Sequence, residues 1–218
     1  YRAQVNMLAG AYEQALADAE HALELDKTSL PAYLMKGAAL AKTGDLKGAL
    51  EALTIYTAYI KDDPQAWLWI GLAQDEAGKS QEALQAYSQA LRLNSRLFEA
   101  LLNRARLYLA EKEGDSALKD YNAAQSLDGE SFEASMGIGK ALLLLEYEGD
   151  AYMQFERTQV LAKADTQKAE LFYWRAQSLE KLGKLDVALS EWQKLLNLPK
   201  GSATEEMEVN GDTNLEIG

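Results

Sequence analysis

The chain has 218 residues, with 34 acidic and 22 basic side chains and a formal net charge of −12. It has no cysteine, which excludes disulfides, thiolate metal sites and a cysteine nucleophile. The acidic balance argues against nucleic acid as a partner, because no cluster of Lys and Arg makes a basic patch. No apolar run approaches membrane-spanning length, so direct membrane insertion is not expected.

Apolar residues at helical spacing predict paired helices, each pair joined by a short turn. One pair lies within residues 64–94, on either side of Gly78 and Lys79. The other expected helices cover residues 1–9, 12–25, 31–42, 46–60, 96–110, 115–127, 131–145, 150–162, 167–182 and 185–198. The helix that ends near Ile60 carries Tyr56 where the next pair has Ala90, which predicts a longer helix with wider packing.

Small residues recur every 34 positions. One column contains alanine throughout, at Ala15, Ala49, Ala83, Ala117 and Ala151. A second column contains either alanine or glycine, at Ala3, Gly37, Gly71, Ala105 and Gly139. A small residue at a fixed helix position allows neighbouring helices to approach closely, so both columns indicate a structural repeat.

The pair within residues 64–94 shows the repeat most fully, with Trp67, Ile70, Gly71, Gly78, Ala83, Tyr87 and Ala90. A 34-residue helix-turn-helix unit with these residues resembles the tetratricopeptide repeat, and the resemblance extends over roughly nine-tenths of the chain. It implies an all-α fold, a right-handed α-α superhelix of about six repeats. The expected units are about residues 1–29, 30–63, 64–97, 98–131, 132–168 and 169–200.

The last unit is displaced by three residues, because its alanine is Ala188 rather than residue 185. The extra residues are expected between Ala164 and Lys168, in a polar connection. Residues 201–218 contain five acidic side chains and no basic one, and they lack helical periodicity. We therefore expect an acidic, flexible C-terminal tail.

In the family that the chain resembles, the first helix of each repeat lines a concave groove where ligands dock. The resemblance therefore implies a non-catalytic scaffold that binds a peptide or helix of a partner protein, with no cofactor. Residues rotated away from the packing positions would face this groove. The candidate groove residues are Met35, Trp69, Leu72, Asn103, Arg106, Lys140, Trp174 and Gln177.

Each candidate also has a structural interpretation. Trp69 and Trp174 could seal the junctions between repeats instead of binding a ligand. Arg106 and Lys140 could hold a ligand carboxylate beside Asn103, or could pair with the acidic residues at the start of their own helices, Glu99 and Glu133. The row Leu34, Leu68, Leu102, Met136 and Tyr173 is apolar in every unit, which indicates packing between repeats.

Resemblance to the repeat domains that hold chaperone C-terminal peptides is poor. At the positions expected to supply Lys, Asn and Arg the chain has Leu68, Leu72, Asn103, Glu133 and Gly137, and only Asn103 fits. An apolar or mixed peptide, or a helix, is therefore the expected ligand.

Catalysis is not expected, because the only histidine, His21, lies between acidic residues on a predicted helix surface.

The alternative function is self-assembly through the repeat ends or the tail, giving a homo-oligomer. Met207, Val209, Leu215 and Ile217 of the tail could occupy a groove and block it. The sequence begins within a repeat, so a targeting signal upstream of Tyr1 would not be seen, and a cytoplasmic location is only weakly favoured.

Overall fold

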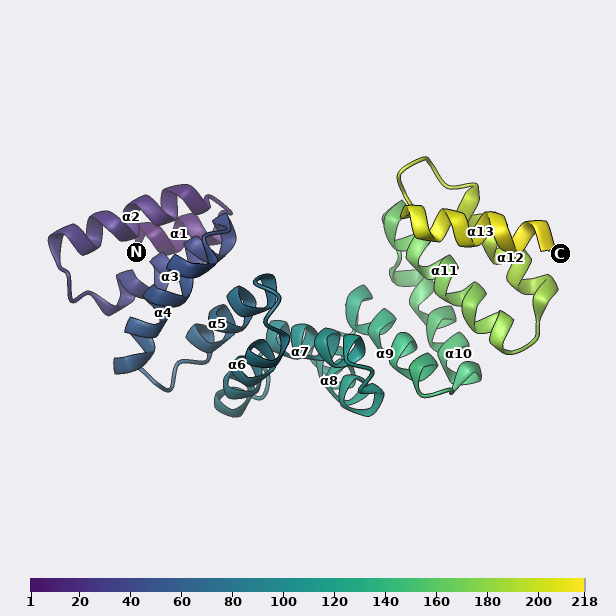
Figure 1. The fold of residues 1–218 in the computed structure, drawn as a ribbon, viewed down its shortest axis with the longest axis horizontal. Coiled ribbons are helices and arrows are strands. Elements are labelled where there is room, and N and C mark those ends of the chain that lie inside the picture. Colours follow the sequence, from purple (N-terminus) through teal and green to yellow (C-terminus); the bar gives the residue numbers. More distant parts are fainter. Residues whose placement is uncertain (218) are drawn as a thin grey trace. The chain divides into compact units, whose positions relative to one another are not determined.

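The computed structural model describes residues 1–217, except for the side chains of residues 208, 212, 213 and 215–217. The described residues form thirteen α-helices in consecutive pairs, one short 3-10 helix and no strand. This is the all-α helical repeat solenoid that the sequence predicts. The chain divides into two compact units, residues 1–104 and residues 105–218 (Figure 1).

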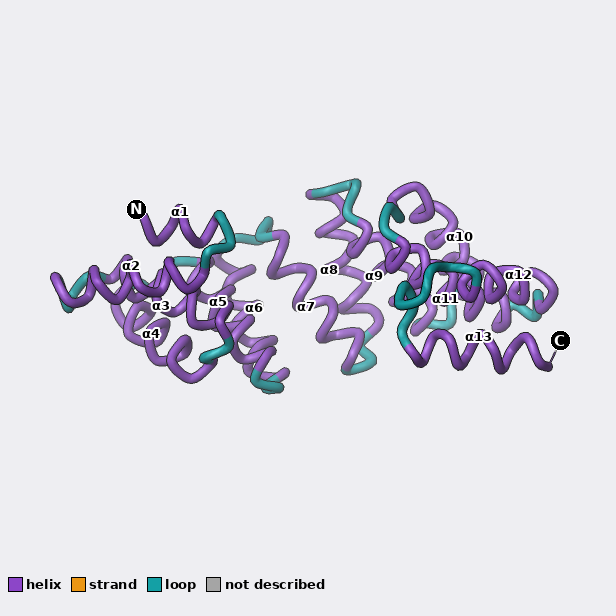
Figure 2. Tube along the Cα trace, turned by 90° about the horizontal axis from the view of Figure 1, so that it is seen from above, coloured by secondary structure: helices purple, strands orange, loops and turns teal. Residues whose placement is uncertain are grey.

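The first unit contains six whole helices and the beginning of a seventh. They are α1 (Arg2–Leu8), α2 (Tyr12–Leu25), α3 (Leu30–Thr43), α4 (Leu46–Tyr59), α5 (Pro64–Glu76), α6 (Ser80–Leu93) and α7 (Phe98–Ala110). Each helix of a pair packs on its partner, and the second helix of one pair packs on the first of the next, as α2 does on α3. Figure 2 shows these neighbours side by side.

The second unit begins within α7. It continues with α8 (Gly114–Leu127), α9 (Phe132–Leu144), α10 (Glu148–Thr158), the 3-10 helix η1 (Gln159–Leu161), α11 (Asp165–Lys181), α12 (Leu185–Leu196) and α13 (Glu205–Ile217). Because α10 ends at Thr158, η1 occupies part of the helix expected over residues 150–162. The residues that displace the last repeat therefore lie near this change of helix type.

Each helix pair turns through a residue with positive φ. The corresponding positions are Gly10, Gly44, Gly78, Lys112, Glu146 and Gly183. Left-handed backbone suits glycine, because other residues bring Cβ too close to the backbone. Lys112 and Glu146, both with φ of 62°, therefore hold a conformation that is unfavourable for their residue type.

The glycines of the second small-residue column lie against the return helix of their own repeat. A Cβ at Gly37 would lie 2.5 Å from Cγ of Leu53, and one at Gly71 would lie 2.5 Å from Cε1 of Tyr87. Gly139 faces the buried ring of Phe155 in the same way. In these three repeats, therefore, the absence of a side chain on the first helix makes room for a large apolar group of the return helix.

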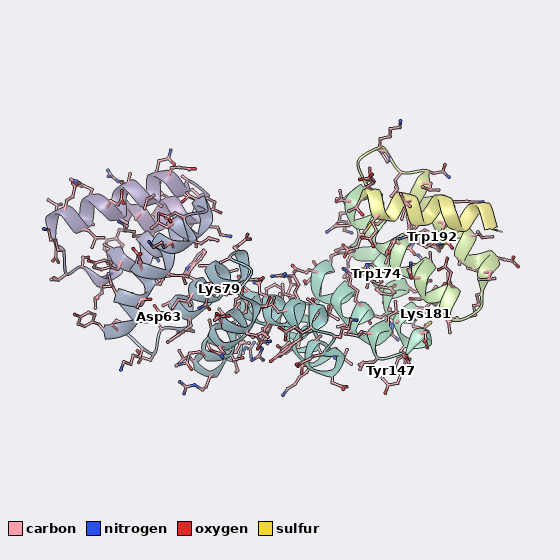
Figure 3. All side chains as sticks on the ribbon, in the orientation of Figure 1. Asp63, Lys79, Tyr147, Trp174, Lys181 and Trp192 are labelled. Atoms are coloured by element: carbon pink, nitrogen blue, oxygen red, sulfur yellow. The ribbon has the colours of Figure 1, made fainter. Side chains whose placement is uncertain are left out.

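The connection from α4 to α5 is held by one carboxylate. Tyr56 donates a hydrogen bond from its hydroxyl to Asp63 Oδ2 at 2.8 Å, and Asp63 Oδ1 accepts from the backbone N–H of Gln65 at 2.8 Å (Figure 3 labels Asp63). Asp63 thus caps α5. The longer helix expected around Tyr56 is wrong, because α4 has 14 residues, as do α2 and α6. Tyr56 folds back onto the loop instead.

Helix α13 is a feature for which the sequence shows no periodicity. Met207 and Ala203 pack against a buried cluster that contains Tyr173, Trp192 and Leu195. The Asn210 amide also donates a hydrogen bond to the Tyr173 hydroxyl at 3.2 Å. These contacts cover the apolar end of the last repeat. The side chains of residues 215 and 217, expected to enter a groove, lie outside the described residues.

Candidate interaction site

Four of the eight candidate groove residues lie in the first unit, and all four are partly exposed: Met35, Trp69, Leu72 and Asn103. Met35 lines a pocket of about 650 Å³ between α1, α2 and α3. Trp69 packs against the core cluster of Leu53, Ile70 and Ala86, and its ring centroid lies 5.7 Å from Lys42 Nζ. Its packing agrees with the junction-sealing interpretation, while part of its surface remains open to a ligand.

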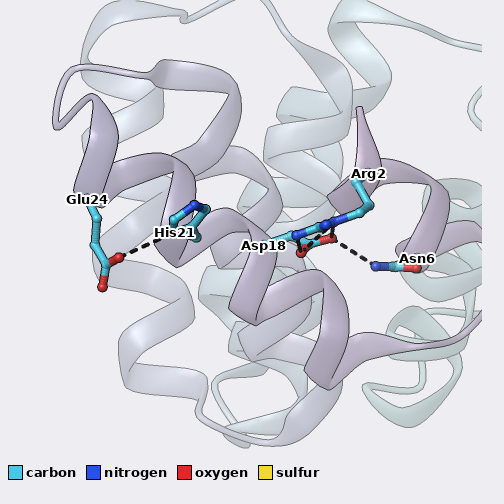
Figure 4. Close-up of polar contacts among 5 residues, drawn as sticks. All are labelled: Arg2, Asn6, Asp18, His21 and Glu24. Carbon is cyan, nitrogen blue, oxygen red and sulfur yellow. Dashed lines mark hydrogen bonds and ion pairs between the residues drawn. The ribbon is translucent and has the colours of Figure 1, made fainter.

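Polar contacts on α1 and α2 flank this pocket (Figure 4). Arg2 Nε donates to both carboxylate oxygens of Asp18 at 2.8 Å, and Asn6 Nδ2 donates to Asp18 Oδ2 at 2.9 Å. The hydrogen bond from Arg2 is the main reason that the pKa of Asp18 lies below its usual value. His21 is exposed and contacts only the neighbouring Glu24 in this group, as expected for a surface histidine.

The second unit contains a pocket of about 370 Å³ that includes two of the candidate groove residues. Its lining comes from four helices: Arg106, Leu109, Tyr121, Phe132, Glu133, Met136, Gly137, Lys140 and Glu170. The structure therefore brings Arg106 and Lys140 to one concavity. Trp174 contacts Lys140 at its edge, whereas Gln177 is partly exposed on α11 and is not among the lining residues.

Gly137 makes room for the Tyr121 ring, and both residues line the pocket. The equivalent positions of the other repeats carry Met35, Trp69, Asn103 and Trp174, all with longer side chains. The ring of Tyr121, which is 4% exposed, fills the space beside Gly137, since a Cβ there would lie closer than 3.0 Å to three ring atoms. The sequence analysis did not select Gly137 or Tyr121. A glycine in a row of large residues was the signal that could have identified them.

Lys140 is held by α11, the first helix of the next repeat. Its Nζ lies 2.5 Å from Glu170 Oε1 and 5.2 Å from the ring centroid of Trp174 (Figure 3 shows Trp174 on α11). The pairing of Lys140 with Glu133, considered from the sequence, is therefore not the one that forms. Lys140, Glu170 and Trp174 together tie α9 to α11 and make one wall of the pocket.

Tyr121 adds a polar group to the lining of the pocket. The Tyr121 hydroxyl forms no hydrogen bond with any residue that the structure describes. Burial raises the pKa of Tyr121 well above its usual value, and the nearby charge of Glu133 raises it further. Tyr121 is therefore a neutral hydroxyl that can donate or accept a hydrogen bond.

The residues that are apolar in every repeat are packing residues, as the sequence predicts. Leu68, Leu102, Met136 and Tyr173 are all less than one-tenth exposed, and Leu34 is partly buried.

In the described part of the chain, no group of three or more His, Cys, Asp or Glu side chains is placed to bind a metal ion. Nor is any described helix both long and apolar enough to cross a membrane.

The family model described as tetratricopeptide repeat matches residues 34–97 and again residues 70–132. The chain is a tetratricopeptide repeat protein. The matched residues run from α3 to the start of α9, and they include the best-formed repeat, α5 and α6. No curated protein matches the sequence.

Solved structures of other tetratricopeptide repeat proteins share the fold. YrrB, a TPR protein with an unusual peptide-binding site, has a TM-score of 0.76 at 16% identity, covering 89% of this chain and 97% of YrrB. MamA (41-end) from Desulfovibrio magneticus RS-1 has a TM-score of 0.71 at 17% identity, covering 85% and 98%. MamA AMB-1 has a TM-score of 0.69 at 20% identity, covering 84% and 98%. At these identities the likeness establishes the fold alone.

Proposed function

We propose that this tetratricopeptide repeat protein binds a peptide or a helix of a partner protein through the face lined by the first helices of its repeats, without catalysis. Repeat arrays of this type serve in general as protein-interaction scaffolds, because each repeat adds surface to an extended binding face. The finer proposal, that binding uses the groove residues, rests on the pocket beside Gly137.

That pocket combines the properties of a peptide site. It has apolar walls from Phe132, Met136 and Leu109, and polar groups at its floor and rim. Small concavities of mixed lining take up single anchoring side chains, which often carry most of the binding energy. YrrB, which shares the fold, has an unusual peptide-binding site, and this property of a structural neighbour gives the proposal further support.

Selection of a random peptide phage library on the immobilised full chain tests the proposal. We expect enriched peptides whose affinity changes about tenfold, which corresponds to about 1.4 kcal/mol, for an Arg106→Ala, Lys140→Ala double variant, because two charges of the pocket lining are lost. A Lys119→Ala, Arg157→Ala double variant removes the same charge from α8 and α10, outside the pocket lining, and should bind as wild type. Failure to enrich any peptide, or equal binding by both variants, would exclude the groove.

A second candidate function is self-assembly through the first repeat. Helix α1 has no buried residue, and Val5 and Leu8 are 62% and 85% exposed. Exposed apolar side chains on one helix are typical of a surface that another chain covers. Sedimentation velocity over a range of concentrations tests this: a mass that rises with concentration, and that a Val5→Asn, Leu8→Asn variant reduces to the monomer, would support assembly. A monomer at all concentrations would exclude it.

A further inference from the structure

The excess of negative charge is concentrated in the second unit. Residues 105–218 contain 21 acidic and 12 basic side chains, so this unit carries −9 of the net charge of −12. A field of this sign attracts cationic partners and repels anionic ones. If the pocket beside Gly137 holds a partner side chain, as proposed above, the charge of the unit selects a basic one.

The groups of the pocket differ in how far they are already paired. Lys140 is neutralised by Glu170 at 2.5 Å and lies over the Trp174 ring. Glu133 is exposed at the rim and has no ion-pair partner among the described side chains. Arg106 is exposed, so water screens its charge. The carboxylate of Glu133 is therefore the charged group best placed to accept a new hydrogen bond.

A second, independent observation places a polar group at the floor. Tyr121 is 4% exposed, its ring lines the pocket, and its hydroxyl has no hydrogen-bond partner among the described residues. A hydroxyl that lines a pocket and has no protein partner can form a hydrogen bond with water or with a ligand group. Glu133 and Tyr121 both line this pocket, so the carboxylate and the phenol belong to one concavity.

The apolar side chains that line the pocket suit the alkyl stem of a basic side chain. Leu109, Phe132 and Met136 give an apolar passage between the rim and the floor. Lysine and arginine have an alkyl stem that packs on such surfaces and an N–H-bearing head that seeks acceptors. We propose that the pocket lined by Tyr121, Glu133 and Gly137 binds a lysine or arginine side chain of a partner peptide, with the cationic head between the Glu133 carboxylate and the Tyr121 hydroxyl.

The test uses the peptides that the random library yields with the full chain. We expect them to share a Lys or Arg whose replacement by norleucine weakens binding about tenfold, the size expected for a charge-assisted hydrogen bond. Glu133→Gln and Tyr121→Phe should weaken the parent peptide without changing the norleucine peptide, since the lost partner is the cationic head. Glu130→Gln, an exposed acidic neighbour, is the control for loss of general charge. Circular dichroism melting confirms that the variants fold.

The outcomes separate this inference from the proposed function. Peptides that depend on Glu or Asp, or a norleucine effect that persists in Glu133→Gln, would overturn the basic pocket and leave peptide binding in the groove intact. Peptides whose binding is unaffected by any of the pocket variants would place the site elsewhere and overturn the inference. Failure to select any peptide would overturn both the inference and the proposed function.

Discussion

The ring of Tyr121 lies in the space that a side chain at position 137 would occupy. In three other repeats, the residue that corresponds to Tyr121 packs on a glycine of its own repeat: Leu53 on Gly37, Tyr87 on Gly71 and Phe155 on Gly139. The fourth repeat has Ala105 instead of glycine at that position, and Tyr121 meets Gly137 on the first helix of the following repeat. This change in glycine position brings the Tyr121 ring to α9, where both residues line the pocket.

Gly137→Ala tests this relationship. The added methyl group overlaps the Tyr121 ring, so the ring or α9 must shift, and overpacking of this kind costs about 1–3 kcal/mol. We expect a lower free energy of unfolding in urea and weaker binding of any peptide that occupies the pocket. Gly129→Ala is the matched control, because a Cβ there meets nothing within 4 Å. Equal effects of both changes would show that Gly137 has no special role.

Two turns can be stabilised by glycine. Lys112 and Glu146 have φ of 62°, which costs a residue with a side chain about 1–2 kcal/mol relative to glycine, offset in part by the entropy of the unfolded glycine. Lys112→Gly and Glu146→Gly should each raise the free energy of unfolding by about 0.5–1 kcal/mol. Thermal melting measures this gain. Gly78→Ala, at φ of 71°, should show the opposite sign.

The interior of the second unit contains an ionic network that links three helices. Arg175, 6% exposed, pairs with Glu156 and lies 3.3 Å from Glu191, and it donates to Gln159 Oε1 at 3.0 Å. Glu191 also accepts from Lys194 at 2.6 Å and is itself 1% exposed. The network joins α10, α11 and α12, and its central pair, Arg175 and Glu191, has little contact with water.

Arg175→Met should lower the free energy of unfolding by about 3–5 kcal/mol, because it leaves the buried carboxylate of Glu191 with only the half-exposed Lys194 as its cation. An Arg175→Met, Glu191→Leu double variant should recover most of this loss, since an apolar pair of similar volume needs no partner. Urea unfolding of wild type, the Arg175→Met and Glu191→Leu single variants and the double variant gives the comparison. A double variant as unstable as the sum of the single changes would argue against charge as the cause.

The pH dependence of Tyr56 follows from its contacts. Burial, together with the hydrogen bond to Asp63, raises the pKa of Tyr56 to about 12 from its usual value of 10.0. The folded state thus favours the neutral phenol. The stabilisation from this shift is complete below pH 10 and disappears as the pH rises from 10 towards 12.

Tyr56→Phe should therefore lower the free energy of unfolding by about 1 kcal/mol at neutral pH, the usual net value of one hydrogen bond. The difference from wild type should shrink above pH 10. Absorbance titration of phenolate formation checks the assignment, because the highest-pH part of the wild-type curve should lose the contribution of Tyr56 in the variant. Exposed Tyr59, changed to Phe, provides the control.

The sequence predicted the repeat because each unit uses the same local rules. Residues at helical spacing, Pro31 in a first turn and small residues every 34 positions act within one helix pair, so they can be read without a structure. The buried apolar row through Leu68 and Met136 was predicted for the same reason. Helix α13 was not predicted, because its apolar residues lack periodicity and it is stabilised by tertiary contacts such as Met207 against Trp192.

The sequence by itself determined the family, the paired helices and which rows pack, because a repeated pattern specifies repeated contacts. Tertiary structure alone decided the partners of the charged and aromatic residues. Lys140 pairs with Glu170 of the next repeat, and Tyr121 packs on Gly137 across a repeat junction. Both contacts depend on how neighbouring helices cross, and a side chain in such a junction has several partners within reach that sequence spacing does not distinguish.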